Sequence, residues 1–127
     1  MKARALWALL AVASVRCGDE HTPVACPAYA AAGLEVSVSS ASNGQPICDA
    51  TVTATEGMYS EQLFGVACRF TGAVERPGTY VVRAERQGFT PSELASVRVV
   101  MGGGECPHVE ETRVTIALAP DDRAAPR

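Results

Sequence analysis

The chain has 127 residues, which suits a single domain, because one hydrophobic core typically takes about 100 to 150 residues. Its composition is 47% hydrophobic and 20% charged, as in ordinary globular proteins, which excludes wholesale disorder. The 11 basic and 14 acidic residues give a net charge of -3 without a basic stripe, so we expect no nucleic-acid partner. The one tryptophan, Trp7, falls in the targeting segment described next, which argues against a carbohydrate site built on an exposed tryptophan.

The amino terminus has the layout of a secretory signal. Lys2 and Arg4 precede the apolar run ALWALLAVA at 5–13, which is too short to span a bilayer. We therefore predict an exported protein with a signal peptide over residues 1–16. The alternative is a buried helix of a cytosolic protein.

Cys17 follows this apolar run, and Cys17-Gly18-Asp19 resembles the start of a mature bacterial lipoprotein. The resemblance implies that the Cys17 thiol is acylated and that lipid chains hold the protein at a membrane surface. Arg16 stands where that family has a small residue, and the alternative is cleavage after Ala13, which leaves Cys17 as a free thiol. Residues 17–32 are rich in Pro and Ala without periodicity, and are predicted to form a tether to the domain.

The cysteine count indicates a disulfide-stapled domain. Five cysteines in an exported chain leave one unpaired, for which Cys17 is the natural candidate. The other four permit three pairings, and the sequence alone does not choose among them. We favour Cys48 with Cys68, which would join the start of one strand to a later strand. Cys26 with Cys106 would then pin the amino-terminal tail to the loop before the last strand.

Two other chemical interpretations of these residues are less favoured. Structural zinc usually takes cysteines in close pairs such as Cys-x-x-Cys, which this chain lacks, and His21 stands far from His108, so we expect no metal. A hydrolase needs a nucleophile, a base and an orienting acid, and the candidate base His108 has Cys106, Glu110 and Glu111 near it in sequence. Because we place Cys106 in a disulfide, we interpret His108 as a loop residue and expect neither catalysis nor a cofactor.

Apolar and polar residues alternate in several short segments of the remaining chain. A first strand is predicted at 34–39 with Leu34, Val36 and Val38 on one face. After a turn at 42–46, a second strand at 47–55 is predicted to point Cys48 and three small apolar residues inward. The two strands should form a hairpin or lie across the sandwich from one another.

The middle of the chain gives a less regular pattern. Residues 56–65 are predicted to form a loop with a short strand, and 66–70 a further strand. Pro77 and Gly78 suit the central positions of a type II turn, with Gly78 at positive φ. This turn would open a strand at 79–85 that points Tyr80, Val82 and Ala84 to one face.

The carboxyl-terminal part is predicted to hold two more strands. A strand at 97–101 is followed by Gly102-Gly103-Gly104, which is predicted to be a mobile loop. The last strand, at 112–118, should point Val114, Ile116 and Leu118 inward. Residues 120–127 are predicted to be a disordered tail.

These strands, without helical periodicity after the signal, predict an all-β sandwich. Four segments resemble the carboxypeptidase regulatory-like domain: Gly44 to Val52, Pro77-Gly78-Thr79-Tyr80, Gly88-Phe89 and Val114 to Leu118. The resemblance covers about 33–119 and implies a seven-stranded Greek-key sandwich of the prealbumin-like, or transthyretin-like, kind. The cysteines look like those of a disulfide-bearing variety found in exported bacterial proteins. No catalytic residues travel with the family.

The resemblance and the export signals together imply a non-catalytic cell-envelope module, tethered or secreted. Its partner would be an unknown protein or envelope component, and it would touch the membrane only through a lipid anchor. We expect a monomer, located as an outer-membrane or periplasmic lipoprotein or as a secreted protein. The alternatives are an accessory protein of an exported peptidase and a small secreted inhibitor.

Overall fold

A computed structural model describes residues 13, 18 and 22–122, which contain eight β-strands and no α-helix. The strands are β1 (Leu34–Ser40), β2 (Thr51–Glu56), β3 (Tyr59–Gln62), β4 (Phe64–Val66), β5 (Arg69–Gly72), β6 (Gly78–Glu85), β7 (Ser92–Val99) and β8 (Thr112–Leu118). The predicted signal peptide, apart from Ala13, and the lipidation candidate Cys17 lie outside the described residues, as do Arg123 to Arg127 of the predicted tail. The all-β fold predicted from the sequence is confirmed.

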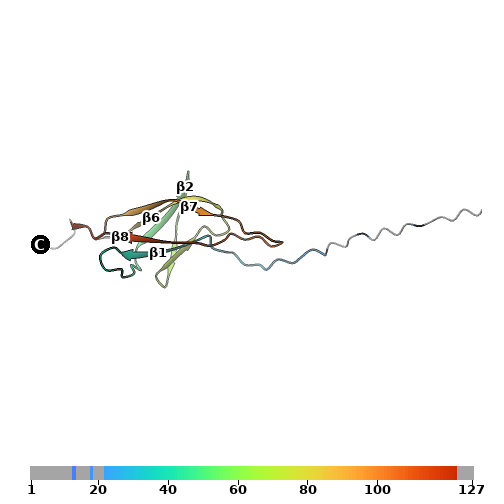
Figure 1. The fold of residues 1–127 in the computed structure, drawn as a ribbon, viewed down its shortest axis with the longest axis horizontal. Coiled ribbons are helices and arrows are strands. Elements are labelled where there is room, and N and C mark those ends of the chain that lie inside the picture. The colour runs from blue at the N-terminus through green and yellow to red at the C-terminus, as the bar shows by residue number, and fades with distance from the viewer. Residues whose placement is uncertain (1–12, 14–17, 19–21, 123–127) are drawn as a thin grey trace, which may run out of the picture.

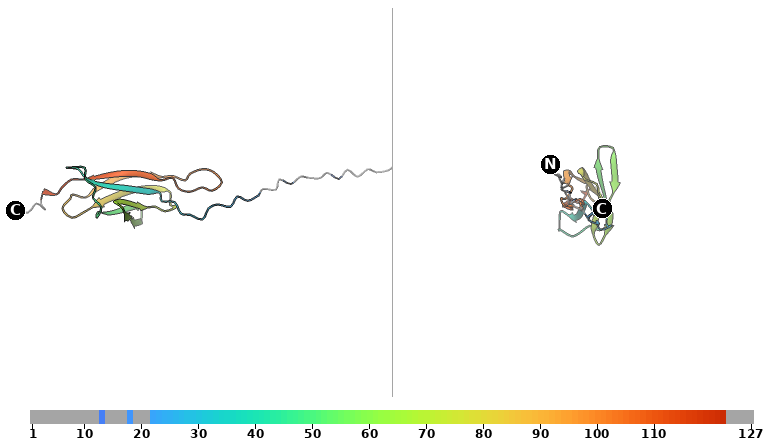
Figure 2. Two further views of the ribbon diagram at one scale, coloured as in Figure 1. Left: turned by 90° about the horizontal axis from the view of Figure 1, so that it is seen from below. Right: turned by 90° about the vertical axis from the view of Figure 1, so that its right-hand side faces the viewer.

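The strands form two four-stranded sheets that face each other across one hydrophobic core (Figures 1 and 2), ordered β4-β5-β1-β8 and β3-β2-β6-β7. The alternating patterns predicted the inward faces of the longer strands correctly. Leu34 and Val36 of β1 and Tyr80 and Val82 of β6 have no exposed surface. Leu118 of β8 is equally buried.

The first and last strands pair with each other in parallel. Their register runs from Leu34 opposite Thr112 to Ser40 opposite Leu118. Backbone hydrogen bonds of 2.8 Å extend the ladder at both ends, from Thr112 N to Gly33 O and from Ala41 N to Leu118 O. Since β2 belongs to the other sheet, the first two strands lie across the sandwich rather than in a hairpin.

The run from Tyr59 to Val66 changes sheets in the middle. Its first half, β3, pairs with β2, and its second half, β4, pairs with β5. Leu63 at the crossover is 4% exposed and donates its N–H to Val52 O at 2.8 Å. This sheet change and the hairpin described next give eight strands, and the predicted number of seven is wrong.

A tight turn separates β4 from β5, so the predicted single strand at 66–70 is wrong. Val66 pairs with Arg69, and the two residues between them have positive φ: Ala67 at 51° and Cys68 at 62°. Two-residue hairpin turns of this kind normally carry Asn or Gly, and neither is present here to mark the turn. A disulfide from Cys68 to Cys48 holds the turn against the loop that precedes β2.

Gly78 does not have the positive φ that a type II turn requires, which corrects the predicted geometry. The chain reverses earlier, where Ala73 and Glu75 have φ of 50° and 49° and Arg76 N donates to Ala73 O at 3.2 Å. Gly78 instead makes room for a side chain, because a Cβ there would collide with the carboxylate of Glu56. That carboxylate accepts a hydrogen bond from Thr79 N at 2.5 Å.

The second strand starts at Thr51 rather than at residue 47. Ile47 N donates to Val38 O at 2.8 Å, so this residue still follows β1, and Ile47 and Ala50 are buried. Cys48 is exposed, which corrects its predicted inward position. At the carboxyl end, Asp121 N donates to Gly88 O at 2.9 Å, so the described start of the predicted tail is paired with the β6–β7 loop.

The connection from β7 to β8 forms an arm that extends from the end of the sandwich beside the amino-terminal segment (Figures 1 and 2). Met101 bridges to Val109, and Gly102 N donates to His108 O at 2.7 Å, so the predicted mobile loop is partly paired. β7 itself begins at Ser92 rather than at residue 97.

Two disulfides staple the described chain. Cys26 joins Cys106 and Cys48 joins Cys68, which is the pairing favoured among the three that the sequence permits. Disulfides persist in oxidising compartments, so the pair indicates an exported protein. In the part of the chain that the structure describes, no helix has the length and apolarity needed to cross a bilayer.

Candidate functional site

The candidate site lies at the end of the sandwich opposite the amino-terminal segment, where the β1–β2 and β6–β7 loops meet the carboxyl end of the described chain (Figures 1 and 2). Each loop has a glycine where the backbone needs one. In the β1–β2 loop, Gly44 has φ of 71°, and Asn43 Oδ1 accepts a hydrogen bond from Gln45 N at 3.0 Å. In the β6–β7 loop, Phe89 N donates to Arg86 O at 3.1 Å and Gly88 has φ of 88°, as the third position of a type II turn requires.

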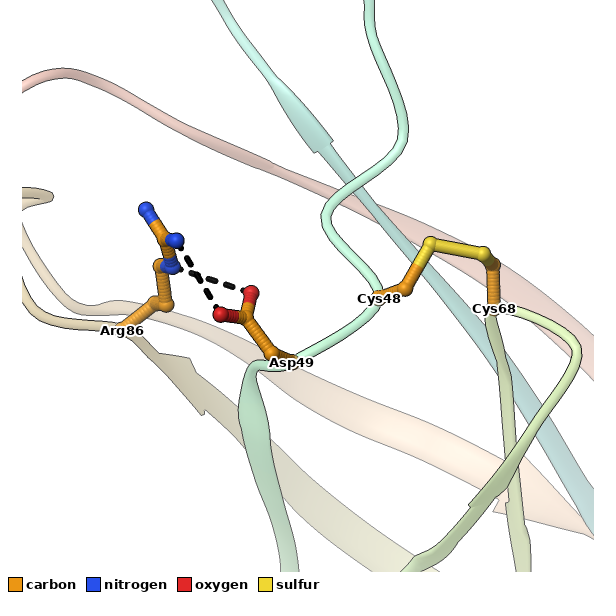
Figure 3. The surroundings of a disulfide bond; sticks show 4 residues. All are labelled: Cys48, Asp49, Cys68 and Arg86. Atoms are coloured by element: carbon orange, nitrogen blue, oxygen red, sulfur yellow. Dashed lines mark hydrogen bonds and ion pairs between the residues drawn. A yellow bond between two sulfur atoms is a disulfide. The ribbon is translucent and has the colours of Figure 1, made fainter.

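An ion pair joins these two loops. Arg86 donates from Nε to Asp49 Oδ1 at 2.9 Å and from Nη2 to Oδ2 at 3.0 Å (Figure 3). Two parallel bonds fix the planes of both groups, which a lysine in place of Arg86 would not do. The hydrogen bonds from Arg86 hold the pKa of the Asp49 carboxyl below its ordinary value, so the carboxylate is charged at neutral pH.

Covalent and apolar contacts hold the pair in place from both sides. Asp49 directly follows Cys48, whose disulfide to Cys68 ties the β1–β2 loop to the β4–β5 turn (Figure 3). The guanidinium carbon of Arg86 lies 5.6 Å from the centre of the Phe89 ring, and Phe89 packs against the core. Phe89 therefore supports the arginine.

Two open hollows share the ion pair as a common wall. The larger is a groove of about 830 Å³, lined by Asp49, Thr51, Glu85, Arg86, Gln87, Gly88 and Pro91. The smaller, of about 330 Å³, is lined by Ser40, Ser42, Asn43, Gln45, Pro46, Ile47, Cys48, Asp49, Arg86, Phe89 and Pro120. We call the two together the distal groove. Its lining combines hydroxyl, amide and paired charged groups with proline, isoleucine and phenylalanine side chains, which suits a ligand that offers hydrogen bonds beside apolar surface.

The residues weighed for catalysis lie at the other end and are engaged differently. Cys106 is in the disulfide with Cys26, so its thiol is not a nucleophile. His108 Nδ1 lies 2.6 Å from Glu75 Oε1, and its ring stacks on Tyr29 at 4.2 Å between centres. Glu111 accepts from Arg113 Nε at 2.6 Å.

Glu75 is the centre of this second cluster, which we call the tether latch: Tyr29, Ala31, Glu75 and His108. Its Oε1 also accepts from Ala31 N at 2.7 Å, and Glu75 N donates to Ala31 O at 2.9 Å. The hydrogen bonds from Ala31 N and then His108 lower the pKa of the Glu75 carboxyl. The last third of the predicted tether is thus held against the domain.

A third cluster lies beside the turn that precedes β6. Arg76 Nη1 donates to Glu56 Oε1 at 2.9 Å and to Tyr80 Oη at 2.8 Å, and the guanidinium carbon lies 3.6 Å from the centre of the Tyr59 ring. The Tyr80 hydroxyl donates back to Arg76 O at 2.7 Å. These bonds join the turn before β6 to the end of β2, so the cluster stabilises the turn.

The sequence pattern singles out neither partner of the Asp49–Arg86 pair, nor Glu75. His108 is considered only as a candidate catalytic base. Asp49 and Arg86 are 37 residues apart and Glu75 and His108 are 33 apart, so no local spacing connects them. Among the described residues, no three His, Cys, Asp or Glu side chains converge as metal ligands would.

Comparisons with known proteins add no identification. No protein-family model matches the chain, and no curated protein matches its sequence.

Proposed function

We propose that this protein is a non-catalytic binding module of the cell envelope, held by its amino-terminal side, that captures a partner in the distal groove. One observation carries the proposal: the amino-terminal segment and the distal groove lie at opposite ends of the sandwich (Figure 1). A module anchored through residues before the domain would therefore present the groove away from the anchor.

The predicted export signal and the two disulfides support the envelope location. Lipidation at Cys17 remains part of the proposal. Intact-mass spectrometry of the protein from membrane and soluble fractions tests it. A mass that begins at Cys17 plus acyl chains supports the anchor, whereas an unmodified chain that begins near Ser14 contradicts it.

The fold part of the proposal is a carboxypeptidase regulatory-like module with Greek-key, prealbumin-like connections. It rests on the sequence resemblance, and the positions of the matching segments support it. Gly44 to Val52 crosses from one sheet to the other, Pro77 to Tyr80 opens β6, and Gly88-Phe89 forms the turn after β6. Val114 to Leu118 lies in β8, which pairs with β1.

The chemistry of the distal groove supports binding rather than turnover. Asp49 and Arg86 neutralise each other, and their outer edges offer an acceptor beside a donor. A neutral ligand surface with paired hydrogen-bonding groups, such as a protein loop or an envelope polymer, fits this edge.

Site-specific photo-crosslinking in intact cells tests the binding proposal. A benzophenone side chain at Gln87, on the wall of the groove, should give adducts of defined mass. The matched control is Met58, whose side chain is fully exposed at the opposite end of β2 and should give none. Equal adducts at the two positions, or none at Gln87, would contradict the proposal.

A further inference from the structure

The ends of the described chain leave the sandwich in opposite directions, so a pull on the chain acts along its long axis (Figures 1 and 2). We propose that the domain is a tension-bearing link, in which the Cys26–Cys106 disulfide carries tension past the sandwich directly into β8. The inference rests on the proposed function for the source of the tension, which is an anchor at one end and a bound partner at the other. Its geometry depends only on the described residues.

The two terminal strands already have an arrangement that resists a pull. β1 and β8 are adjacent and parallel over seven register pairs. The chain enters β1 at one end of this ladder and leaves β8 at the other. When the Cys26–Cys106 disulfide is absent, a pull on the two chain ends therefore slides the strands past each other and strains all the ladder hydrogen bonds at once, rather than one after another.

The disulfide provides a shorter covalent route than the chain itself. Cys26 and Cys106 are 80 residues apart in sequence, and their Cα atoms are 5.4 Å apart. All strands from β1 to β7 lie inside the closed loop, and only β8 lies outside it. Tension that arrives at Cys26 passes through the two sulfur atoms to Cys106 and then along β8. The seven enclosed strands and the glycines of the arm are not stretched.

The tether latch keeps the junction aligned. Tyr29 stacks on His108 at 4.2 Å, and Glu75 binds both His108 and Ala31. The segment around Cys26 consequently runs beside the arm that carries Cys106 (Figure 1). Beyond the arm, Thr112 Oγ1 donates to Arg98 O at 2.6 Å and joins the start of β8 to β7.

Single-molecule stretching of the full chain, with handles attached at its two ends, tests whether tension passes through the disulfide. The measured quantity is the length of the fully stretched molecule. At about 3.5 Å per extended residue, the loop of 80 residues hides about 280 Å of chain while the disulfide is intact. Cys48–Cys68 closes a loop of 20 residues inside it, which hides about 70 Å. The C26S/C106S variant should therefore stretch about 210 Å further than the oxidised protein. The matched control C48S/C68S should stretch no further than the oxidised protein.

Reduction of the native protein gives the same test without a variant that has to fold. Dithiothreitol becomes a cyclic disulfide as it converts each protein disulfide to two thiols, and full reduction should add about 280 Å to the stretched length. The proposal would be overturned if the oxidised protein stretched as far as the C26S/C106S variant. It would also be overturned if the stretched length were the same before and after reduction.

The parallel ladder is tested in the C26S/C106S background by moving one handle. Handles at the two chain ends load β1 and β8 lengthwise, whereas handles at Asn43 and the carboxyl terminus peel them apart from one end. The lengthwise pull should need the higher rupture force. An equal or lower rupture force for the lengthwise pull would overturn the claim that the parallel pairing of β1 and β8 resists it. None of these three experiments involves a ligand or a lipid, so failure of the proposed function leaves their outcomes unchanged.

Discussion

Asp49 and Arg86 stand 37 residues apart in the chain and meet through two parallel hydrogen bonds of 2.9 and 3.0 Å. The pair joins the loop after β1 to the loop after β6 and separates the two hollows of the distal groove. The contact therefore links the two loops across the groove.

The titration of Asp49 should report the ion pair. The hydrogen bonds from Arg86 lower its pKa from the ordinary 3.8, so the pair stabilises the fold above that value and is lost as pH falls through the lowered pKa. In R86Q, the Asp49 carboxyl should titrate higher by NMR than in the wild type. An unchanged midpoint would mean that the two side chains do not pair in solution. Arg83→Gln, which removes a cation bound to Glu93 instead, is the matched control.

The Cys48–Cys68 disulfide should contribute a large part of the stability of a domain this size. A disulfide that closes a loop of 20 residues restricts the unfolded chain, which adds about 3 kcal/mol to the free energy of unfolding. We expect C48A/C68A to lose about that much unfolding free energy in urea, with a larger slope because its unfolded chain is less compact. A loss indistinguishable from that of an exposed pair such as S42A/S60A would show that the reduced turn keeps its position unaided.

Ala67 should gain stability from a glycine. It has φ of 51°, a conformation that costs a side chain about 1 kcal/mol, and it is exposed. A67G should therefore unfold at higher urea concentration, with a gain of about 1 kcal/mol. Ala41→Gly at an exposed turn position without positive φ should instead lose stability. If both variants lose stability, the turn does not strain Ala67.

The sequence predicted the sandwich core well because burial and the strand period act on the same residues. Leu34, Val36, Tyr80 and Val82 alternate with polar neighbours, and a register error would expose all of them at once. The favoured cysteine pairing is the one in the structure because it joins chain segments that the strand order brings to the same end.

What could not be predicted depends on contacts between distant residues. The turn at Ala67 and Cys68 lacks Asn and Gly and is held by a disulfide to Cys48. The partners of Arg86 and His108 come from distant loops, Asp49 before β2 and Glu75 before β6, at spacings that only the folded sheets define. The distal groove combines three chain segments and therefore has no motif in the sequence.

Substitution of Gly78 by alanine tests whether this glycine is needed to make room for the Glu56 side chain. A Cβ there would collide with the Glu56 carboxylate, so G78A should displace it, weaken its hydrogen bonds to Thr79 N and Arg76, and lower the unfolding free energy. Removing the obstacle in E56A/G78A should make the added methyl group much less costly than it is in the wild-type background. A double-mutant cycle in urea measures this coupling. If the two effects simply add, Gly78 is required for its backbone freedom, as the type II turn prediction had it.

The tether latch should weaken in acid. The hydrogen bonds from Ala31 N and then from His108 lower the pKa of Glu75 below the ordinary 4.5. A lowered carboxyl pKa means that the contribution is complete above 4.5 and is lost as pH falls through the lowered value. The Ala31 amide proton should thus exchange slowly near neutral pH and lose part of its protection in that acidic window, down to the level that a neutral acceptor gives, after correction for the intrinsic exchange rate. In E75Q, whose side-chain oxygen still accepts from Ala31 N, protection should no longer change across the window. Protection that falls equally in both proteins would assign the weakening to another group.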